Sequence, residues 1–542
     1  MKKIVFSLIT ALVVGLLYFY VTLPAINLHD PGFYGLIILM AAAYCVSSLF
    51  QARSKKRGSA VNWSLGEILH TLKVTCLPPA IICGALVVIY FLGQLISAPL
   101  FHANAYSSIL TVEDGDFTQE VEELSFDSIP MLDKDSAERL GSRKLGELSD
   151  MVSQFEVASD YSQINYGGRP VRVTPLVYGD LIKWWTNRSE GIPAYIRIDM
   201  VTQNAEVVRL DEGMKYTTAE HFFRNLDRHL RVNYPTYMFG DAVFEIDENE
   251  TPYWVCPRIV KSIGLFGGTD INGAVLVNAI TGECTYYEAD DVPGWVDRVY
   301  SADLLVAQYD YYGTYNGGFW NSIFGQKGVT VTTDGYNYIA MDDDVYMYTG
   351  ITSVTSDQSN IGFILVNQRT KYTTFYSVAG ATEQSARESA QGLVQDLGYQ
   401  ATFPLLLNIA GQPTYFMALK DSSNLVKQYA MVNVQYYQNA VTGNTVADCE
   451  TAYKELLLQQ GLADVEAIIE TSDTGIIADI RTAVIDGNSH YYIQLKGNDF
   501  YYDLTAADDA AIVILNVGDR VEVLHSDADE GNLRSAYSVA KK

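Results

Sequence analysis

Three long apolar stretches in the first hundred residues constrain the fold of this 542-residue chain more than any other feature. Residues 4–23, 33–50 and 74–96 contain no charged side chain. About 20 apolar residues, at roughly 1.5 Å per residue, cross a hydrocarbon layer of about 30 Å. Because backbone amides in lipid must be satisfied within their own segment, each stretch is expected to form a transmembrane helix. The Pro78-Pro79 pair is expected to kink the third helix.

The charges beside these stretches predict their orientation. Two lysines precede the first stretch and four cationic residues lie in 53–57, whereas the loop 24–31 has Asp30 and no cation. Cytoplasmic loops are enriched in Lys and Arg. We therefore expect a plasma-membrane protein with a cytoplasmic N-terminus and an extracytoplasmic portion after about residue 100. The alternative is a cleaved signal peptide, but the first apolar run is long for one and no A-x-A site follows.

The portion beyond the three stretches is acidic and folded. Residues 1–100 hold seven Lys and Arg against two Asp and Glu, which leaves 30 cationic and 62 anionic side chains for the other 442 residues. Such acidity disfavours nucleic acid as a partner. Charged residues make up 19% of the chain and hydrophobic ones 48%, a balance typical of packed domains and not of disorder. The 38 tyrosines suit the half-buried faces of β-sheets.

One pattern repeats in this portion: an apolar-x-apolar triplet followed by Asp or Asn, two residues and Thr. It occurs at 196–202, 275–281 and 364–370, and a weaker fourth copy begins at Met431. Alternating apolar residues around such a turn predict a β-hairpin, and the Asp or Asn side chain is expected to accept hydrogen bonds from the turn backbone. A second hairpin is expected before each copy, with turns at 165–170, 248–252, 342–344 and 408–413.

A helical pattern follows each copy, so the predicted unit is hairpin, hairpin, helix. The four expected helices cover 217–231, 292–309, 382–397 and 446–460. One unit is too small to bury its own sheet face, so the four units, within 161–465, are expected to stack or to pack helix onto sheet.

These repeats, with the Asn-Ala-Ile-Thr-Gly-Glu turn at 278–283, resemble the PepSY-type repeats of bacterial envelope proteins. The resemblance covers about 160–460. It implies small extracytoplasmic α/β modules with inhibitory, regulatory or protein-binding roles. The units here are longer than those of the family, and no peptidase motif follows them.

The two ends of the acidic portion differ from the repeats. Residues 101–160 are expected to form an acidic link with a mostly solvated helix at 133–148. Residues 474–542 contain five predicted strands, with a short helix at 510–516 before the fourth, which resembles an OB-like β-barrel. The predicted class is therefore α+β: a membrane domain (1–100), the link, four repeat units and the barrel. OB folds often bind single-stranded nucleic acid, but the acidity here disfavours that.

No catalytic or cofactor motif is present, and we predict no catalytic, cofactor-binding or metal-binding residue and no cofactor. His221 and His229 are eight residues apart on one predicted helix, too far for one metal ion. The triplet 342–344 offers too few oxygens for Ca²⁺. Cys256 and Cys284 lie on strands predicted to be neighbours and are able to pair there, but three cysteines beyond the spans do not make a disulfide framework.

Three functions remain open. The first is a non-catalytic, membrane-anchored protein that binds or regulates an envelope protein or a cell-wall polymer. The second is an extracytoplasmic hydrolase of cell wall or peptides, which requires two or more of His221, His229, the triplet 342–344 and Glu383 to converge in one cleft. The third is a subunit of a larger membrane complex. Trp184, Trp185 and Trp295 are expected to be packing anchors and not sugar platforms.

Overall fold

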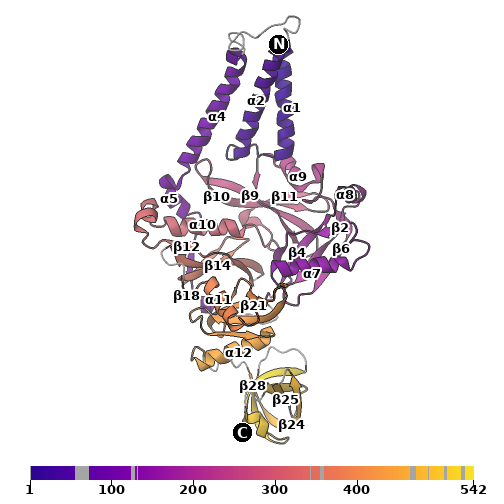
Figure 1. The fold of residues 1–542 in the computed structure, drawn as a ribbon, viewed down its shortest axis with the longest axis vertical. Helices are drawn as coiled ribbons and strands as arrows, with labels where there is room; N and C mark the ends of the chain where they lie inside the picture. The colour runs from indigo at the N-terminus through magenta and orange to yellow at the C-terminus, as the bar shows by residue number, and fades with distance from the viewer. Residues whose placement is uncertain are drawn as a thin grey trace. The chain divides into compact units, whose positions relative to one another are not determined.

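The computed structural model describes residues 2–54, 72–123, 129–130, 132–341, 343–354, 359–463, 471–485, 488–505, 510–525 and 532–542. They form two compact units. Unit 1 comprises Met1–Gly115 and Pro130–Thr382, and unit 2 comprises Asp116–Ile129 and Glu383–Lys542. Both units contain helices and antiparallel sheets, which confirms the predicted α+β class (Figure 1).

Three helices in unit 1 are long and apolar enough to cross a membrane: α1 (Lys2–Thr22), α2 (Pro31–Ser54) and α4 (Leu77–Ile96). Helices at the three predicted positions are confirmed among the described residues, and their length and apolarity fit membrane spans. The expected kink is not in the middle of the third span. Pro78 and Pro79 lie in the first turn of α4, after a π-helical turn at Leu72–Cys76. Proline is tolerated there because its missing N–H has no partner to lose.

Four sheets share one plan. One strand of each sheet pairs on one side with a second long strand and on the other side with two short strands, which follow one another along it. A further strand pairs with the free side of the second long strand. Sheets 1, 2 and 3 belong to unit 1 and sheet 4 to unit 2. Sheet 3 gains a parallel edge strand, β1 (Glu113–Gly115), from the predicted link.

Sheet 1 contains β2 (Phe155–Val157), β3 (Ser162–Tyr166), β4 (Arg169–Tyr178), β5 (Ile192–Asp199) and β6 (Ala205–Met214). Sheet 2 contains β7 (Met238–Phe239), β8 (Val243–Ile246), β9 (Pro252–Ile263), β10 (Gly267–Asn278) and β11 (Cys284–Glu288). Sheet 3 contains β12 (Thr330–Thr332), β13 (Asn337–Met341), β14 (Asp344–Ser353), β16 (Gly362–Asn367) and β17 (Thr373–Tyr376). Sheet 4 contains β19 (Gln400–Ala401), β20 (Leu405–Ile409), β21 (Gln412–Lys420), β22 (Val426–Asn433) and β23 (Ala440–Gly443). A separate pair is β15 (Ser359–Asn360) with β18 (Gly380–Ala381).

The turn that closes the second hairpin of each sheet has the predicted chemistry. In every copy, the side-chain Oδ1 of the first turn residue accepts hydrogen bonds from the backbone N–H groups two and three residues further on, at 2.8–3.0 Å. These residues are Asp199, Asn278, Asn367 and Asn433. The local sequence therefore determines the turn, whatever the sheet packs against.

Sheet 2 is buried on both faces. On β9, Trp254 and Cys256 share a hydrophobic core with Tyr195 of sheet 1. Val255, between them, shares a second core with Met347 of sheet 3. Because successive side chains of a strand point to opposite faces, sheet 2 lies between sheets 1 and 3. Two-sided burial explains why its long strands read as continuous apolar runs.

Two of the predicted helices begin about ten residues later than the sequence pattern indicates. In place of 217–231, a 3₁₀ turn η3 (Phe222–Arg224) precedes α9 (Leu226–Asn233). In place of 292–309, α10 (Ala302–Tyr315) begins only after Ser301, whose side chain accepts a hydrogen bond from Leu304 N. The apolar residues of 292–299 are spaced as in a helix, but they are the buried side of an irregular loop. The other two helices, α11 (Glu383–Leu393) and α12 (Val446–Gln459), lie within their predicted ranges.

The predicted link contributes three helices: α5 (Pro99–Ser107), α6 (Phe117–Glu120) and α7 (Lys134–Gly146). Asp133 caps α7 as expected, accepting from Ser136 N at 3.0 Å. The helix is not mostly solvated, however, because Ala137, Gly141 and Leu145 are buried against sheet 1. A Cβ at Gly141 would lie 2.1 Å from the Tyr161 hydroxyl, so only glycine permits this approach.

The C-terminal strands of unit 2 close into a barrel. They are β24 (Thr471–Ile485), β25 (Asn488–Leu495), β26 (Tyr501–Thr505), β27 (Arg520–His525) and β28 (Leu533–Lys541). The order is β24-β25-β26-β28-β27, with β27 returning to β24 and a parallel pairing of β26 with β28. A 3₁₀ segment at Ala510–Ile514 precedes the fourth strand, where the sequence predicts a short helix.

The tip of the β9–β10 hairpin is fixed to the end of α4 by one serine. Ser97 Oγ accepts hydrogen bonds from Leu265 N at 2.9 Å and Phe266 N at 3.0 Å, and it donates to Gly93 O at 2.6 Å. The approach is close, because a Cβ at Gly93 would lie 2.7 Å from the Leu265 side chain. Gly264 supplies the left-handed turn (φ +61°) that brings the tip to the serine.

An arginine of α9 makes the second attachment, at the end of α1. Arg231 Nε donates to Leu23 O at 2.9 Å, and its Nη1 donates to Tyr237 O at 2.5 Å. Beside it, Ile26 N donates to Pro235 O at 2.8 Å. The β9–β10 hairpin is therefore bonded to Ser97, directly after α4, and α9 is bonded to Leu23, directly after α1. Figure 1 shows α9 beside the end of α1.

Replacing Ser97 by alanine is expected to destabilise unit 1 by about 1–3 kcal/mol, because two part-buried backbone N–H groups lose their acceptor. Thermal unfolding of the full chain in detergent measures this. The matched control is Ser108→Ala, since Ser108 is exposed and bonds only the carbonyl of Asn104 in its own helix. Equal melting temperatures for the two variants would contradict this role of Ser97.

Candidate functional site

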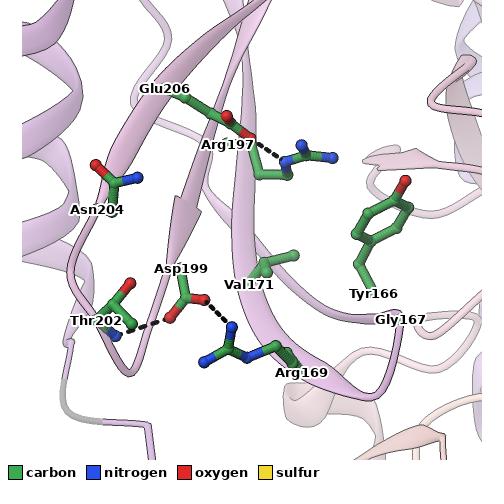
Figure 2. A pocket seen from close by; sticks show the side chains of 9 residues that line it. All are labelled: Tyr166, Gly167, Arg169, Val171, Arg197, Asp199, Thr202, Asn204 and Glu206. Atoms are coloured by element: carbon green, nitrogen blue, oxygen red, sulfur yellow. Dashed lines mark hydrogen bonds and ion pairs between the residues drawn. The ribbon is translucent and has the colours of Figure 1, made fainter.

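A polar pocket of about 430 Å³ lies at one end of sheet 1 (Figure 2). It is lined by residues of the β3–β4 and β5–β6 turns and of the adjoining parts of β3, β4, β5 and β6. The lining residues are Tyr166, Gly167, Arg169, Val171, Arg197, Asp199, Thr202, Asn204 and Glu206. The pocket thus forms at the repeated turns that the sequence pattern singles out, in the first of the four copies.

Strand geometry places these side chains on one face. Arg197 and Asp199 are two residues apart on β5 and so point to the same side. The register sets Arg197 opposite Glu206 on β6 and Asp199 opposite Val171 on β4. Opposite charges facing each other across strands stabilise the pairing. In Figure 2, Tyr166 and Asn204 lie on opposite sides of Arg197, and Tyr166 bounds the pocket on its side.

Arg197 is held in place by two carboxylates. Its Nε pairs with Glu206, and its Nη1 pairs with Glu250 at 2.6 Å. Its guanidinium carbon lies 4.9 Å from the centre of the Tyr166 ring. Burial lowers the pKa of Arg197, but the hydrogen bonds to Glu250 and Glu206 outweigh burial and raise it. Arg197 is therefore a permanently charged and preorganised part of the wall.

Arg169 is the more available cation. Its Nη1 lies 3.5 Å from Asp199 Oδ2, and half of its side chain is exposed. Within the lining, two arginines face two carboxylates, so the pocket has little net charge. None of the lining residues is Ser, Cys or His. The paired charges and the hydroxyl and amide groups of the lining suit hydrogen bonding to a neutral ligand rich in hydroxyl or amide groups.

A second polar group lies inside unit 1. The carboxyl of Glu245 is fully buried and accepts hydrogen bonds from the backbone N–H of Asp297 at 2.9 Å and of Arg298 at 3.0 Å. Asp297 is also buried and accepts from Asn165 N at 2.7 Å. Burial raises the pKa of Glu245, and Arg298 and the two N–H groups only partly offset it. Burial also raises the pKa of Asp297, reinforced by Glu245 and by Asp344.

This carboxyl pair predicts a pH dependence of stability. The folded protein keeps a proton on the pair where the unfolded chain has lost it, so the folded state binds more protons. The stabilisation of the folded state by this bound proton is complete below the ordinary carboxyl pKa of about 4, and it is lost as pH rises through the raised pKa of the pair. Glu245→Gln removes one titrating group, so the variant's melting temperature is expected to fall less than that of the wild type between about pH 5 and about pH 8.

The control for this comparison is Glu248→Gln, since Glu248 is an exposed carboxyl in the turn that follows β8. It is expected to keep the wild-type dependence on pH. A Glu245→Gln variant with an unchanged dependence would show that the buried pair does not titrate in this range.

The two histidines predicted to share a helix lie on different elements. His221 precedes the 3₁₀ turn η3 and packs edge-on against Trp184, with ring centres 4.6 Å apart. His229 lies on α9, where its Nε2 is 2.7 Å from Gly282 O and its ring is 4.5 Å from that of Tyr216. Each histidine thus has its own structural partners.

The acidic candidates also have separate surroundings. Asp342 lies outside the described residues. Asp344 forms a two-pronged pair with Arg369, at 2.7 Å for both bonds, and accepts from Asn367 Nδ2 at 2.8 Å. Glu383 is buried at the start of α11 in unit 2. Among the residues that the structure describes, no group of three or more His, Cys, Asp or Glu side chains is arranged to hold a metal ion.

The cysteines and tryptophans partly differ from expectation. Cys256 and Cys284 lie on the two strands that flank β10, opposite Val275 and Val277, so they are not on neighbouring strands. All six cysteines of the chain are free. Trp184 is a buried anchor as predicted, and Trp295 packs on Tyr253 with ring centres 5.1 Å apart. Trp185 is no anchor, because it is 59% exposed.

The pocket residues were not singled out by sequence reasoning. The sequence contains part of the information needed to find them, because Asp199 and Thr202 belong to the repeated turn and Arg197 precedes them. The decisive contact is absent from any local pattern, since Glu250 comes from the β8–β9 turn of the next sheet.

No protein-family model matches the sequence, and no curated protein matches it. Among solved structures, an engineered ACO/RPE65 chimera has a TM-score of 0.14 and 8% identity over 71% of this chain. A cobalt-substituted ACO from Synechocystis has a TM-score of 0.14 and 9% identity over 72% of this chain. The chain spans 65% of the length of each of these proteins. A TM-score this low carries no argument about fold or function.

Proposed function

We propose that this chain is a membrane-anchored, non-catalytic protein that binds or regulates a component of the cell envelope. The observation that carries the proposal is the pocket at the end of sheet 1, whose charged groups are paired with one another and whose lining contains no Ser, Cys or His. A pocket of this kind fits a neutral, hydroxyl-rich or amide-rich ligand, such as a cell-wall polymer or a peptide segment. The two attachments to the membrane helices would hold it at a fixed position relative to the bilayer.

Two further features agree with this proposal. The repeated turns of the sequence resemble PepSY-type modules, whose roles include protein binding, and this proposal extends that resemblance to the present chain. The strand order of the C-terminal barrel, with its parallel pairing of β26 with β28 and a helical segment before the fourth strand, supports an OB-like assignment. A barrel with this acidity would serve as a second protein-binding or glycan-binding module.

Crosslinking of the full chain in native membranes, followed by purification and mass spectrometry, tests the binding role. Arg169→Ala is expected to lose most of the crosslinked partner, because it removes the available cation of the pocket. The matched control is Arg209→Ala, which removes an equally exposed arginine of the same sheet, paired with Asp150 outside the pocket. Equal recovery with both variants would remove the pocket from the binding role.

The orientation proposed for this chain leads to a separate prediction. The cationic residues before the first span and after the second favour a cytoplasmic N-terminus, so protease added to intact cells should digest the portion beyond about residue 100. An epitope tag at the N-terminus serves as the internal control and should stay protected until the cells are lysed. Protection of the acidic portion in intact cells would invert the orientation and withdraw the envelope function.

A further inference from the structure

A group of exposed apolar side chains lies close to the end of α1. It belongs to two short elements, α8 (Leu181–Asn187) and the 3₁₀ turn η3. Its members, which we call the apolar patch, are Leu181 (64% exposed), Ile182 (75%), Trp185 (59%), Phe222 (56%) and Phe223 (66%). Contiguous exposed groups of this kind, unlike single exposed apolar residues, mark a contact surface.

The patch continues from a membrane-spanning helix. The ring of Phe223 lies edge-on to that of Tyr20, with centres 6.2 Å apart, and Tyr20 is two residues before the end of α1. Arg228 also contacts Tyr20: its guanidinium carbon lies 4.7 Å from the ring centre, and its Nε donates to Tyr20 O at 3.4 Å. The next residue of the helix, Val21, is 71% exposed. The patch therefore adjoins the level at which α1 leaves the hydrocarbon layer.

The backbone holds the patch rigidly outward. Phe222 has φ +53°, a left-handed conformation that costs a bulky L-residue on the order of 1–3 kcal/mol. Its ring is braced by Trp184 at 5.9 Å, and the indole of Trp184 donates to Glu220 Oε2 at 2.8 Å. A backbone conformation with strain of this size persists only where the surrounding contacts hold it in place. Its effect here is to present two adjacent phenylalanines to the exterior.

Arginines accompany the aromatic side chains. The guanidinium carbon of Arg188 lies 3.6 Å from the ring centre of Trp185. Arg224 Nη1 donates to Arg188 O at 2.6 Å, which joins η3 to the end of α8. Tryptophan with arginine beside it is the combination that proteins place at the boundary between lipid tails and headgroups, where rings contact the acyl chains and guanidinium groups reach phosphate.

We propose that the apolar patch is inserted in the headgroup layer of the leaflet that faces the sheets, as a membrane contact additional to the three spanning helices. Figure 1 shows α8 and α9 on the side of the molecule where α1 ends. The inference rests on the packing of the patch against α1 and is independent of the proposed binding function and of the orientation. Together with the attachment of α4, it would fix the tilt of unit 1 against the bilayer.

Tryptophan quenching in nanodiscs tests the proposal with the full chain. The discs contain phosphatidylcholine, either ordinary or brominated near the headgroup end of its acyl chains. The contribution of Trp185 is the difference between the wild type and Trp185→Phe, a conservative change at an exposed position. Brominated lipid is expected to remove most of this contribution. The control difference, from Trp295→Phe, reports a ring packed within unit 1 and is expected to be unaffected.

Aqueous acrylamide distinguishes the other possible surroundings of Trp185. Quenching by acrylamide without quenching by brominated lipid would show that the patch faces water. Protection from both quenchers would show that protein, such as a second copy of the chain, covers it. Either outcome overturns the proposal, and quenching by bromine alone supports it.

Discussion

The two-sided burial of sheet 2 is the constraint on which unit 1 depends. The central parts of β9 and β10 are buried on both faces, since sheet 1 covers Trp254 and Cys256 and sheet 3 covers Val255. The same strands extend beyond the core to the hairpin tip that meets Ser97. Packing in the core and attachment to the membrane are therefore properties of one pair of strands. A change that loosens either neighbouring sheet would also loosen the link to α4.

The pocket and the apolar patch have different relations to this core. The pocket is built from the turn ends of sheet 1, and it is completed by Glu250 from sheet 2, so its geometry depends on how the two sheets stack. The patch is built from α8, inserted between β4 and β5, and from the loop that follows β6. The pocket thus lies on the repeated turns themselves, whereas the patch lies on segments that join the repeated strands. The scaffold is thus repeated, and the chemical groups on it are particular to one copy.

The sequence is most informative where structure is decided locally. Asp199 and Asn278 form their turns through their own side chains, so the hairpins can be predicted without knowledge of the fold. The three spans follow from length and apolarity alone. The segment 292–299 is wrongly predicted as helical because the buried residues of this irregular loop are spaced as in a helix. Only Ser301, as the N-cap, indicates where α10 begins. The pocket needs a pairing between Arg197 and Glu250, which no local pattern contains.

The free cysteines have a consequence for where this protein can fold. Cys256 is fully enclosed, and burial raises the pKa of its thiol, which makes it a poor nucleophile. Burial raises the pKa of Cys284 to about 11 in the same way. Since neither thiol closes a covalent link, the sheets reach their final form without any oxidant. The fold of these sheets therefore does not depend on disulfide formation.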